Sequence, residues 1–128
     1  MVIETILIVD DQPVIRFLLR QILEDEGFQC LEASDGEIAI QMLTDHSLVH
    51  LLLTDFQMPR INGLQLLNYV KTHPTFGNIP VILMTAEHSL DLQKTALQGG
   101  ACQVLFKPLD SVELKACVQA LFAPQQAA

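Results

Sequence analysis

The sequence predicts an α/β fold in which a parallel sheet lies between two layers of helices. Short apolar or β-branched runs alternate about five times with segments whose apolar residues repeat every three or four positions. Parallel strands are joined by right-handed crossovers, so helices are expected on both faces of the sheet. With 128 residues, 50% of them hydrophobic and 17% charged, the chain can form one domain with its own core.

The first strand and helix are predicted within residues 5–27. Residues 5–9 are β-branched or apolar throughout, which is typical of a strand covered on both faces. Pro13 is tolerated in a first helical turn, with Asp11 or Gln12 as the cap, and Gly27 ends the helix. Its apolar residues have amphipathic spacing: Ile15, Leu18, Leu19 and Ile22.

A weaker strand over residues 29–33 and a turn at residues 34–36 precede a second helix, which ends near Asp45-His46. The next strand begins at Leu51 as a fully buried run and stops at Asp55. Pro59 prevents the chain from extending this strand or starting a helix at once. Asp55 is therefore expected at the carboxyl end of a central strand.

The second half of the chain continues the alternation. A third helix follows Gly63 and is broken at Pro74, and Pro80 precedes a fourth strand over residues 81–85. A fourth helix is predicted over residues 90–98 and a fifth strand over residues 103–106. Asp110 and Glu113 have capping-box spacing, which marks the start of the last helix. Its apolar stripe consists of Leu114, Cys117, Val118 and Leu121.

Polar side chains stand at the ends of four of the predicted strands. These side chains are Asp10 with Asp11, Asp55, Thr85 and Lys107. The carboxyl ends of parallel strands open onto one edge of the sheet, where α/β proteins bind ligands. We therefore expect three carboxylates, one hydroxyl and one amine to share a small crevice.

Three carboxylates in one crevice need a counter-charge. Two like charges about 4 Å apart repel by roughly 4 kcal/mol at an effective dielectric constant near 20, and Lys107 supplies one positive charge. Oxygen ligands with water in the remaining positions suit Mg²⁺. A metal held there can neutralise an incoming phosphoryl group while a carboxylate attacks the phosphorus. Lys107 and Thr85 are then placed to contact phosphoryl oxygens.

Each residue also has a simpler structural interpretation. Asp10-Asp11 would cap the first helix, Asp55 would close its strand, Thr85 would be an ordinary strand-end residue and Lys107 would be solvated. Their joint placement at strand ends favours a site. The sequence has no Gly-rich phosphate loop, Ser-His-Asp arrangement or evident Cys nucleophile.

Four segments form a specific signature: residues 8–11, residues 54–59 with Asn62-Gly63, residues 80–86, and Gly100-Ala101 leading to Lys107-Pro108. Through them, from about Thr5 to Phe122, the sequence resembles a bacterial response-regulator receiver domain and is similar to the chemotaxis-type (CheY-like) regulators. The resemblance implies a flavodoxin-like, doubly wound sheet of strand order 2-1-3-4-5 with five helices in three α/β/α layers.

The resemblance also implies a function for the acidic crevice. Asp55 would be the phosphoacceptor, taking a phosphoryl group from the histidine of a sensor histidine kinase or phosphotransfer protein. Asp11 and Asp55 would bind Mg²⁺ directly, with the backbone carbonyl of Gln57 as a third ligand and Asp10 acting largely through water.

The resemblance gives roles to residues of the later strands and loops as well. Thr85 would move toward the phosphoryl group and Lys107 would pair with it, and the Lys107-Pro108 bond would be cis. Gln57 and Glu87 occupy positions that tune self-dephosphorylation in this family.

The output surface implied by the family combines the fourth helix, the fifth strand and the last helix. It would bind a downstream protein or fused output domain, or form a phosphorylation-dependent homodimer. The family often has an aromatic residue three positions before the lysine, where this chain has Val104, while Phe106 shares the strand face. We therefore expect a backbone and helix shift rather than a flipped ring. Free and phosphomimetic-bound forms that superimpose over residues 85–107 would contradict this hypothesis.

Two alternatives have different functions. One is a Mg²⁺-dependent phosphatase with an aspartyl nucleophile, although Gln57 stands where such enzymes keep a second acid and no cap domain is visible. The other is an unphosphorylated interaction domain with a receiver fold, against which the complete set of polar strand ends argues. A phosphoacceptor domain is therefore expected rather than an enzyme with substrate turnover.

Composition limits the partners and the location. The net charge of −8 and the pI near 4.7 argue against direct binding of nucleic acid. The apolar runs are too short to enter a membrane, no secretion signal is evident, and Cys30, Cys102 and Cys117 are expected to be reduced, mostly buried thiols in a cytoplasmic protein. We expect residues 1–123 to form the domain and residues 124–128 to be a disordered tail or the start of a linker.

Overall fold

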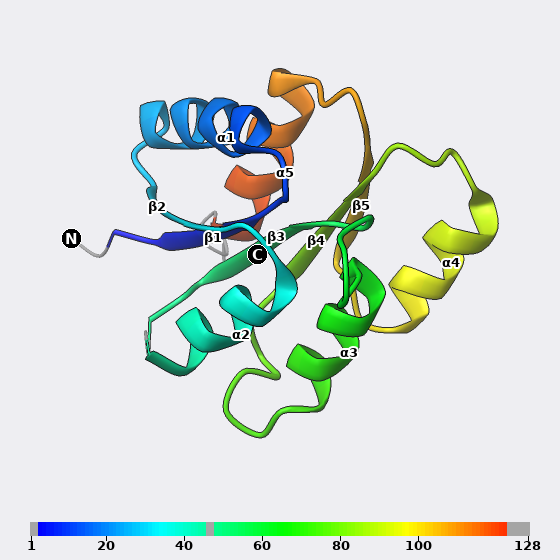
Figure 1. Cartoon of the computed structure of the whole chain (residues 1–128). Helices are drawn as coiled ribbons and strands as arrows, with labels where there is room; N and C mark the ends of the chain where they lie inside the picture. Colours follow the sequence, from blue (N-terminus) through cyan, green and yellow to red (C-terminus); the bar gives the residue numbers. More distant parts are fainter. Residues whose placement is uncertain (1–2, 46–47, 123–128) are drawn as a thin grey trace, which may run out of the picture.

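The computed structural model describes residues 3–45 and 48–122, which form three layers with helices on both sides of a parallel sheet (Figure 1). The strands are β1 (Thr5–Val9), β2 (Gln29–Ala33), β3 (Leu51–Asp55), β4 (Val81–Thr85) and β5 (Gln103–Phe106). The helices are α1 (Pro13–Asp25), α2 (Gly36–Asp45), α3 (Gly63–Thr72), α4 (Leu90–Gln98) and α5 (Ser111–Phe122). The predicted tail, residues 124–128, lies outside the described residues. Among those described, no helix has the length and hydropathy needed to span a membrane.

The sheet has the order β2-β1-β3-β4-β5, and all of its strand pairs are parallel. The predicted strand order and three-layer architecture are therefore confirmed. The register pairs Val9 with Thr54, Asp55 with Met84, and Thr85 with Phe106. The strands consequently end at nearly the same level, so the residues that follow them meet at one edge of the sheet.

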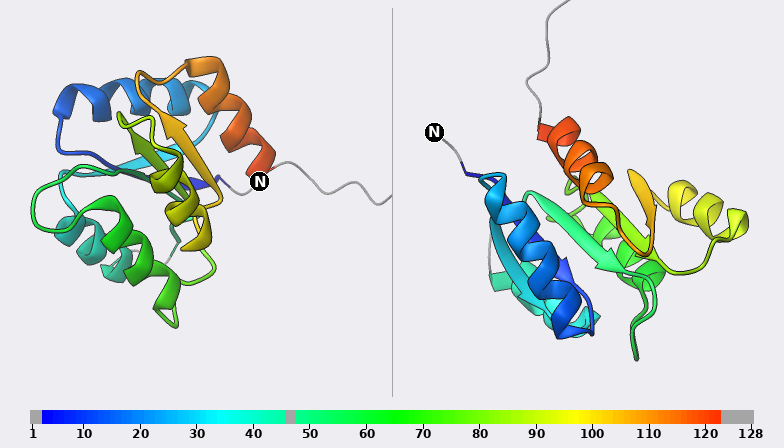
Figure 2. Two further views of the ribbon diagram at one scale, coloured as in Figure 1. Left: turned by 90° about the vertical axis from the view of Figure 1, so that its right-hand side faces the viewer. Right: turned by 90° about the horizontal axis from the view of Figure 1, so that it is seen from above.

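Side chains of each strand alternate between two separate cores. Ile6 and Ile8 of β1 pack with residues of α1 and α5, whereas Leu7 and Val9 pack with residues of α2, α3 and α4. Figures 1 and 2 show the same division, with α1 and α5 on one face of the sheet. Because both faces are covered, β3 and β4 are buried along their whole length.

Gln12, one of the two predicted caps of α1, is its N-cap residue, although its side chain makes no capping hydrogen bond. The local predictions that differ concern the cap of α5 and one thiol. The Asp110 carboxylate accepts a hydrogen bond from the Val112 amide (2.8 Å) rather than from the Glu113 amide that a capping box requires. A capping box is found instead at Asn62, ahead of α3. Cys30 is buried and Cys117 is partly buried, but Cys102 is exposed because it precedes the edge strand β5.

Candidate functional site

Three carboxylates meet where β1 and β3 end. Oxygen atoms of Asp10, Asp11 and Asp55 all lie within 4.8 Å of one another. Asp10 is fully buried and Asp55 is 6% exposed, while Asp11 is exposed to solvent. This set of clustered oxygen donors with solvent access fits a hard divalent cation, as the sequence predicted.

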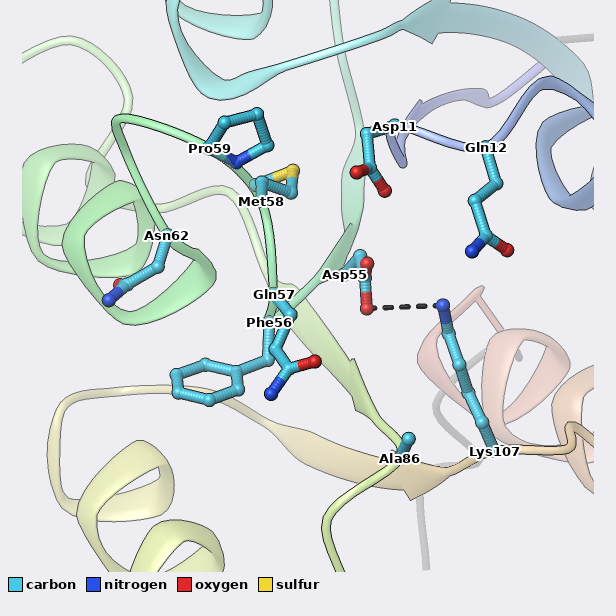
Figure 3. Close-up of a pocket in the computed structure, with 10 residues that line it drawn as sticks. All are labelled: Asp11, Gln12, Asp55, Phe56, Gln57, Met58, Pro59, Asn62, Ala86 and Lys107. Atoms are coloured by element: carbon cyan, nitrogen blue, oxygen red, sulfur yellow. Dashed lines mark ion pairs between the residues drawn. The ribbon is translucent and has the colours of Figure 1, made fainter.

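Lys107 is the cation of this cluster. Its Nζ lies 3.0 Å from Asp10 Oδ2 and 3.1 Å from Asp55 Oδ1 (Figure 3). The Lys107 amide donates to the Thr85 carbonyl (2.7 Å), and the bond to Pro108 is cis, as expected. One ammonium facing three carboxylates leaves an excess of negative charge in the cluster.

The pKa values in the cluster reflect this crowding. Burial raises the pKa of the Asp55 carboxyl, and the negative charge of Asp10 raises it further, while Lys107 opposes both effects. Burial lowers the pKa of Lys107, but its hydrogen bond with Asp10 and the charges of Asp10 and Asp55 outweigh burial and raise that pKa overall. Lys107 is therefore charged at neutral pH.

A cavity of about 570 Å³ opens over the carboxylates. Four of the residues predicted from the sequence line it: Asp11, Asp55, Gln57 and Lys107. Figure 3 shows the side chains of Asp11, Asp55 and Lys107 pointing toward a common space. The remaining lining residues come from the loops after β1, β3 and β4: Gln12, Phe56, Met58, Pro59, Asn62 and Ala86.

Asp10 and Thr85 are not among the residues that line this cavity. Asp10 lies behind it and holds Lys107. Thr85 is 1% exposed, and its hydroxyl oxygen accepts a hydrogen bond from the Glu87 amide (3.0 Å). The structure thus places Thr85 at the predicted strand end, with its hydroxyl engaged by the loop that follows.

Three features around the site were not predicted. The Gln57 side chain donates to Glu87 (3.0 Å), which joins the loops after β3 and β4. Arg60, at a positive φ of 69°, pairs with Asp35 (2.6 Å) and so ties the loop after β3 to the start of α2. Gly63 lies so close to β3 that an added Cβ would be 2.5 Å from the Asp55 carbonyl oxygen.

The aromatic residue of β5 contacts the loop after β4. Val104 is buried at 4% exposure. The ring of Phe106 stacks on that of His88, with centroids 4.8 Å apart and an interplanar angle of 15°. Phe106 is also the register partner of Thr85. This contact connects the end of β4 with β5 although the chain has valine at position 104.

The comparison with known families agrees with this geometry, since the model of the response regulator receiver domain family matches residues 6–119. The chain is a response regulator receiver domain. A receiver domain is a phosphoacceptor rather than a true enzyme, so the phosphatase alternative is wrong. Membership of this family also accounts for the acidic cluster at the strand ends, which is able to hold a metal.

Similar proteins include regulators that this chain covers almost fully and longer ones of which it covers about half. The receiver domain is 38% identical over 118 residues to a probable chemotaxis protein CheY from Rhizobium etli, covering 91% of each chain. It is 40% identical over 117 residues to the transcriptional regulatory protein CpxR of Escherichia coli, covering 91% of this chain and 48% of CpxR. A putative response regulator from Chloroflexus aurantiacus superimposes with a TM-score of 0.89 at 29% identity, covering 96% of this chain and 100% of that one.

Proposed function

We propose that this receiver domain accepts a phosphoryl group on Asp55 in a Mg²⁺-dependent reaction and so relays a signal in the cytoplasm. The donor would be the phosphohistidine of a sensor histidine kinase or phosphotransfer protein. The observation that carries the proposal is the position of Asp55, which lines a solvent-open cavity between the Asp11 carboxylate and the Lys107 ammonium.

The donor set fits Mg²⁺. Asp11, Asp55 and the Gln57 backbone carbonyl would hold the ion, with Asp10 acting through water, because all four residues offer hard oxygen ligands. The excess negative charge of the cluster favours a divalent cation over a second ammonium. When bound, Mg²⁺ offsets the charge that an incoming phosphoryl group adds.

The chemical step is an in-line displacement. A carboxylate oxygen of Asp55 forms a bond to phosphorus while the bond from phosphorus to the donor imidazole nitrogen breaks, and the electron pair leaves with the nitrogen. Lys107, already 3.1 Å from Asp55, can pair with a phosphoryl oxygen. Asp10 keeps the Lys107 ammonium aimed at the cavity from its buried side.

Thr85 would couple phosphorylation of Asp55 to a change in the output surface. Its hydroxyl, now accepting from the Glu87 amide, would turn to donate to the phosphoryl group, so the loop of residues 86–89 loses that restraint. His88 in this loop stacks on Phe106. A shift would therefore reach the α4-β5-α5 surface, where a downstream protein, a fused output domain or a second copy would bind.

Intact mass measurement after incubation with acetyl phosphate tests the proposal. We expect one added phosphoryl group in the presence of Mg²⁺, and none with EDTA or in Asp55→Asn. Asp45→Asn, which changes an exposed carboxylate of α2 away from the cavity, is the matched control and should be phosphorylated normally. If the wild-type protein is not phosphorylated and also does not bind Mg²⁺, the proposal is wrong and the alternative of an unphosphorylated interaction domain is favoured.

A further inference from the structure

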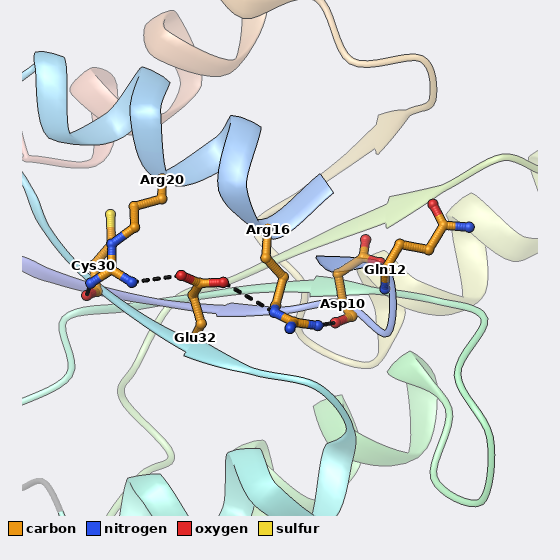
Figure 4. A network of polar contacts seen from close by, with 6 residues as sticks. All are labelled: Asp10, Gln12, Arg16, Arg20, Cys30 and Glu32. Carbon is orange, nitrogen blue, oxygen red and sulfur yellow. Dashed lines mark hydrogen bonds and ion pairs between the residues drawn. The ribbon is translucent and has the colours of Figure 1, made fainter. Parts of the chain in front are cut away.

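A line of charged side chains leads from β2, at the edge of the sheet, to the acidic cluster (Figure 4). Arg16 of α1 donates through Nη1 to the backbone carbonyl of Asp10 (2.7 Å) and through Nε to Glu32 Oε1 (3.1 Å). Arg20, one turn later, donates to Glu32 Oε2 (2.6 Å) and to the Cys30 carbonyl (2.7 Å). Glu32 thus holds both guanidinium groups, but only that of Arg16 reaches the site.

Asp10 is held by four other residues. Its amide donates to the Ala33 carbonyl (3.2 Å), its Oδ1 accepts from the Gln12 amide (2.9 Å), and its Oδ2 accepts from Lys107 (3.0 Å). The Arg16 contact occupies its carbonyl oxygen, and the Arg16 side chain is only 16% exposed. The backbone and the side chain of Asp10 are therefore both fixed.

The Asp10 carbonyl belongs to the peptide that joins Asp10 to Asp11. Asp11 is exposed, and among the hydrogen bonds of the described residues none involves its carboxylate. The direction of the Asp11 side chain therefore depends on the orientation of the peptide before it. Arg16 is the side chain that holds this peptide.

We propose that Arg16 is a positioning residue for divalent metal binding, which it assists by orienting the Asp10–Asp11 peptide from an anchor on Glu32. The proposal rests on the Mg²⁺-dependent function proposed above. Charge alone predicts the opposite effect, because removing a cation near an acidic cluster strengthens the binding of another cation. The sign of the change in Mg²⁺ affinity therefore distinguishes positioning from electrostatics.

The test is calorimetric titration of the unphosphorylated protein with MgCl₂. Partners that orient metal ligands typically contribute 10–100-fold to affinity, so we expect Arg16→Met to raise the Kd for Mg²⁺ about tenfold. Arg20→Met is the matched control. It also removes one positive charge and one guanidinium bound to Glu32, but Arg20 makes no contact with Asp10. Its Kd should stay within about twofold of wild type.

Thermal unfolding in EDTA shows whether each variant is folded. If Arg16→Met is unfolded, Arg16→Lys decides the question, because lysine keeps the positive charge but lacks the planar guanidinium fork that binds the Asp10 carbonyl and Glu32 in fixed directions; we expect its Kd to rise about threefold. Folded Arg16 variants that bind Mg²⁺ as tightly as wild type, or more tightly, would overturn the positioning role. A wild-type protein that does not bind Mg²⁺ would instead overturn the proposed function.

Discussion

The side-chain amide of Gln57 donates a 3.0 Å hydrogen bond to Glu87, which connects the loops that follow β3 and β4. Gln57 lines the acidic cavity and both residues are exposed, so the contact lies on its solvent side. Water that hydrolyses a phosphoryl group on Asp55 would approach from this side. We therefore expect the pair to restrict access to the proposed phosphorylation site.

Breaking this contact should shorten the lifetime of the phosphorylated protein. We expect Gln57→Ala and Glu87→Ala each to raise the hydrolysis rate constant about threefold, which is the size of effect expected of one exposed polar contact. The double variant should hydrolyse no faster than either single variant, because all three lose the same interaction. Decay of the phosphorylated mass after removal of acetyl phosphate measures the rates, and additive effects would show that the two side chains act independently.

The stability of the metal-free domain should depend on pH through Asp55. Burial raises the pKa of this carboxyl, so the folded state binds the proton more tightly than the unfolded state, and the ionised form is destabilising. This destabilisation is fully present above the raised pKa of the folded state and disappears below the unfolded-state pKa of about 3.9. Asp55→Asn should therefore raise the free energy of unfolding at pH 7 by about 1 kcal/mol, or about 4 °C in Tm.

Thermal scans in EDTA from pH 7 down to pH 4 follow this difference, which should shrink as the pH falls. Saturating Mg²⁺ should stabilise wild type more than Asp55→Asn, because a ligand that binds only the folded state adds to stability. An advantage of Asp55→Asn that does not change with pH would contradict the role of the buried charge.

Gly63 should be essential for the geometry of the site. A Cβ there would lie 2.5 Å from the Asp55 carbonyl oxygen and 2.8 Å from Phe56 Cα, both of which are backbone atoms. Gly63→Ala should therefore destabilise the fold by about 2 kcal/mol and also slow phosphorylation by acetyl phosphate, because α3 must move away from β3. At Gly27 the φ angle is +92° and no atom lies within 4 Å of an added Cβ. Gly27→Ala should therefore destabilise the fold by about 1 kcal/mol and leave phosphorylation unchanged.

The stack of His88 on Phe106 should transmit the effect of phosphorylation to the output surface. In wild type we expect phosphorylation to change amide chemical shifts in residues 85–89, in β5 and in α4. In Phe106→Ala or His88→Ala the changes should remain within residues 85–87. Phe28→Ala removes a different aromatic pair, with Phe122, and should not interrupt the signal. Changes in α4 that persist in both Phe106→Ala and His88→Ala would show a different route.

A donor protein should need the apolar cavity beside the acidic one. This second cavity, of about 530 Å³, is lined by α1 and by residues 107–109, and it shares Ala86 and Lys107 with the acidic cavity. Leu18 lines it and is 50% exposed. Leu18→Ala should slow phosphotransfer from a phosphorylated histidine kinase about tenfold and leave phosphorylation by acetyl phosphate unchanged. Equal effects on both donors would place the defect inside the acidic cavity.

The arrangement of the strand ends could be predicted because it depends on few variables. Apolar runs identify the strands, and parallel strands put their carboxyl ends at one edge, so the joint placement of Asp10, Asp11, Asp55 and Lys107 follows from the sequence alone. Thr85 was also placed correctly at its strand end. The contact of its hydroxyl with the Glu87 amide was not foreseen, since it depends on how the loop folds back.

The contacts that were missed involve long side chains or unusual backbone. Arg16 reaches the Asp10 carbonyl from the first turn of α1, and the sequence analysis gave this residue no role. Arg60 adopts a positive φ although it is not glycine, and nothing in the sequence marks that conformation. Similarly, Asn62 and Asp110 are both suitable cap residues, and only the structure shows which of them forms a capping box.

The order of the strands sets the distance over which a signal must travel. Asp55 ends β3, and β5 lies two strands away in the sheet, which corresponds to about 10 Å at the usual strand spacing. That distance is close to the Debye length of about 8 Å at physiological ionic strength. The charge of about −2 on a phosphoryl group would therefore act on a partner at β5 as an electric field even before any atom moves, and raising the salt concentration should weaken this part of the response while leaving the conformational part intact.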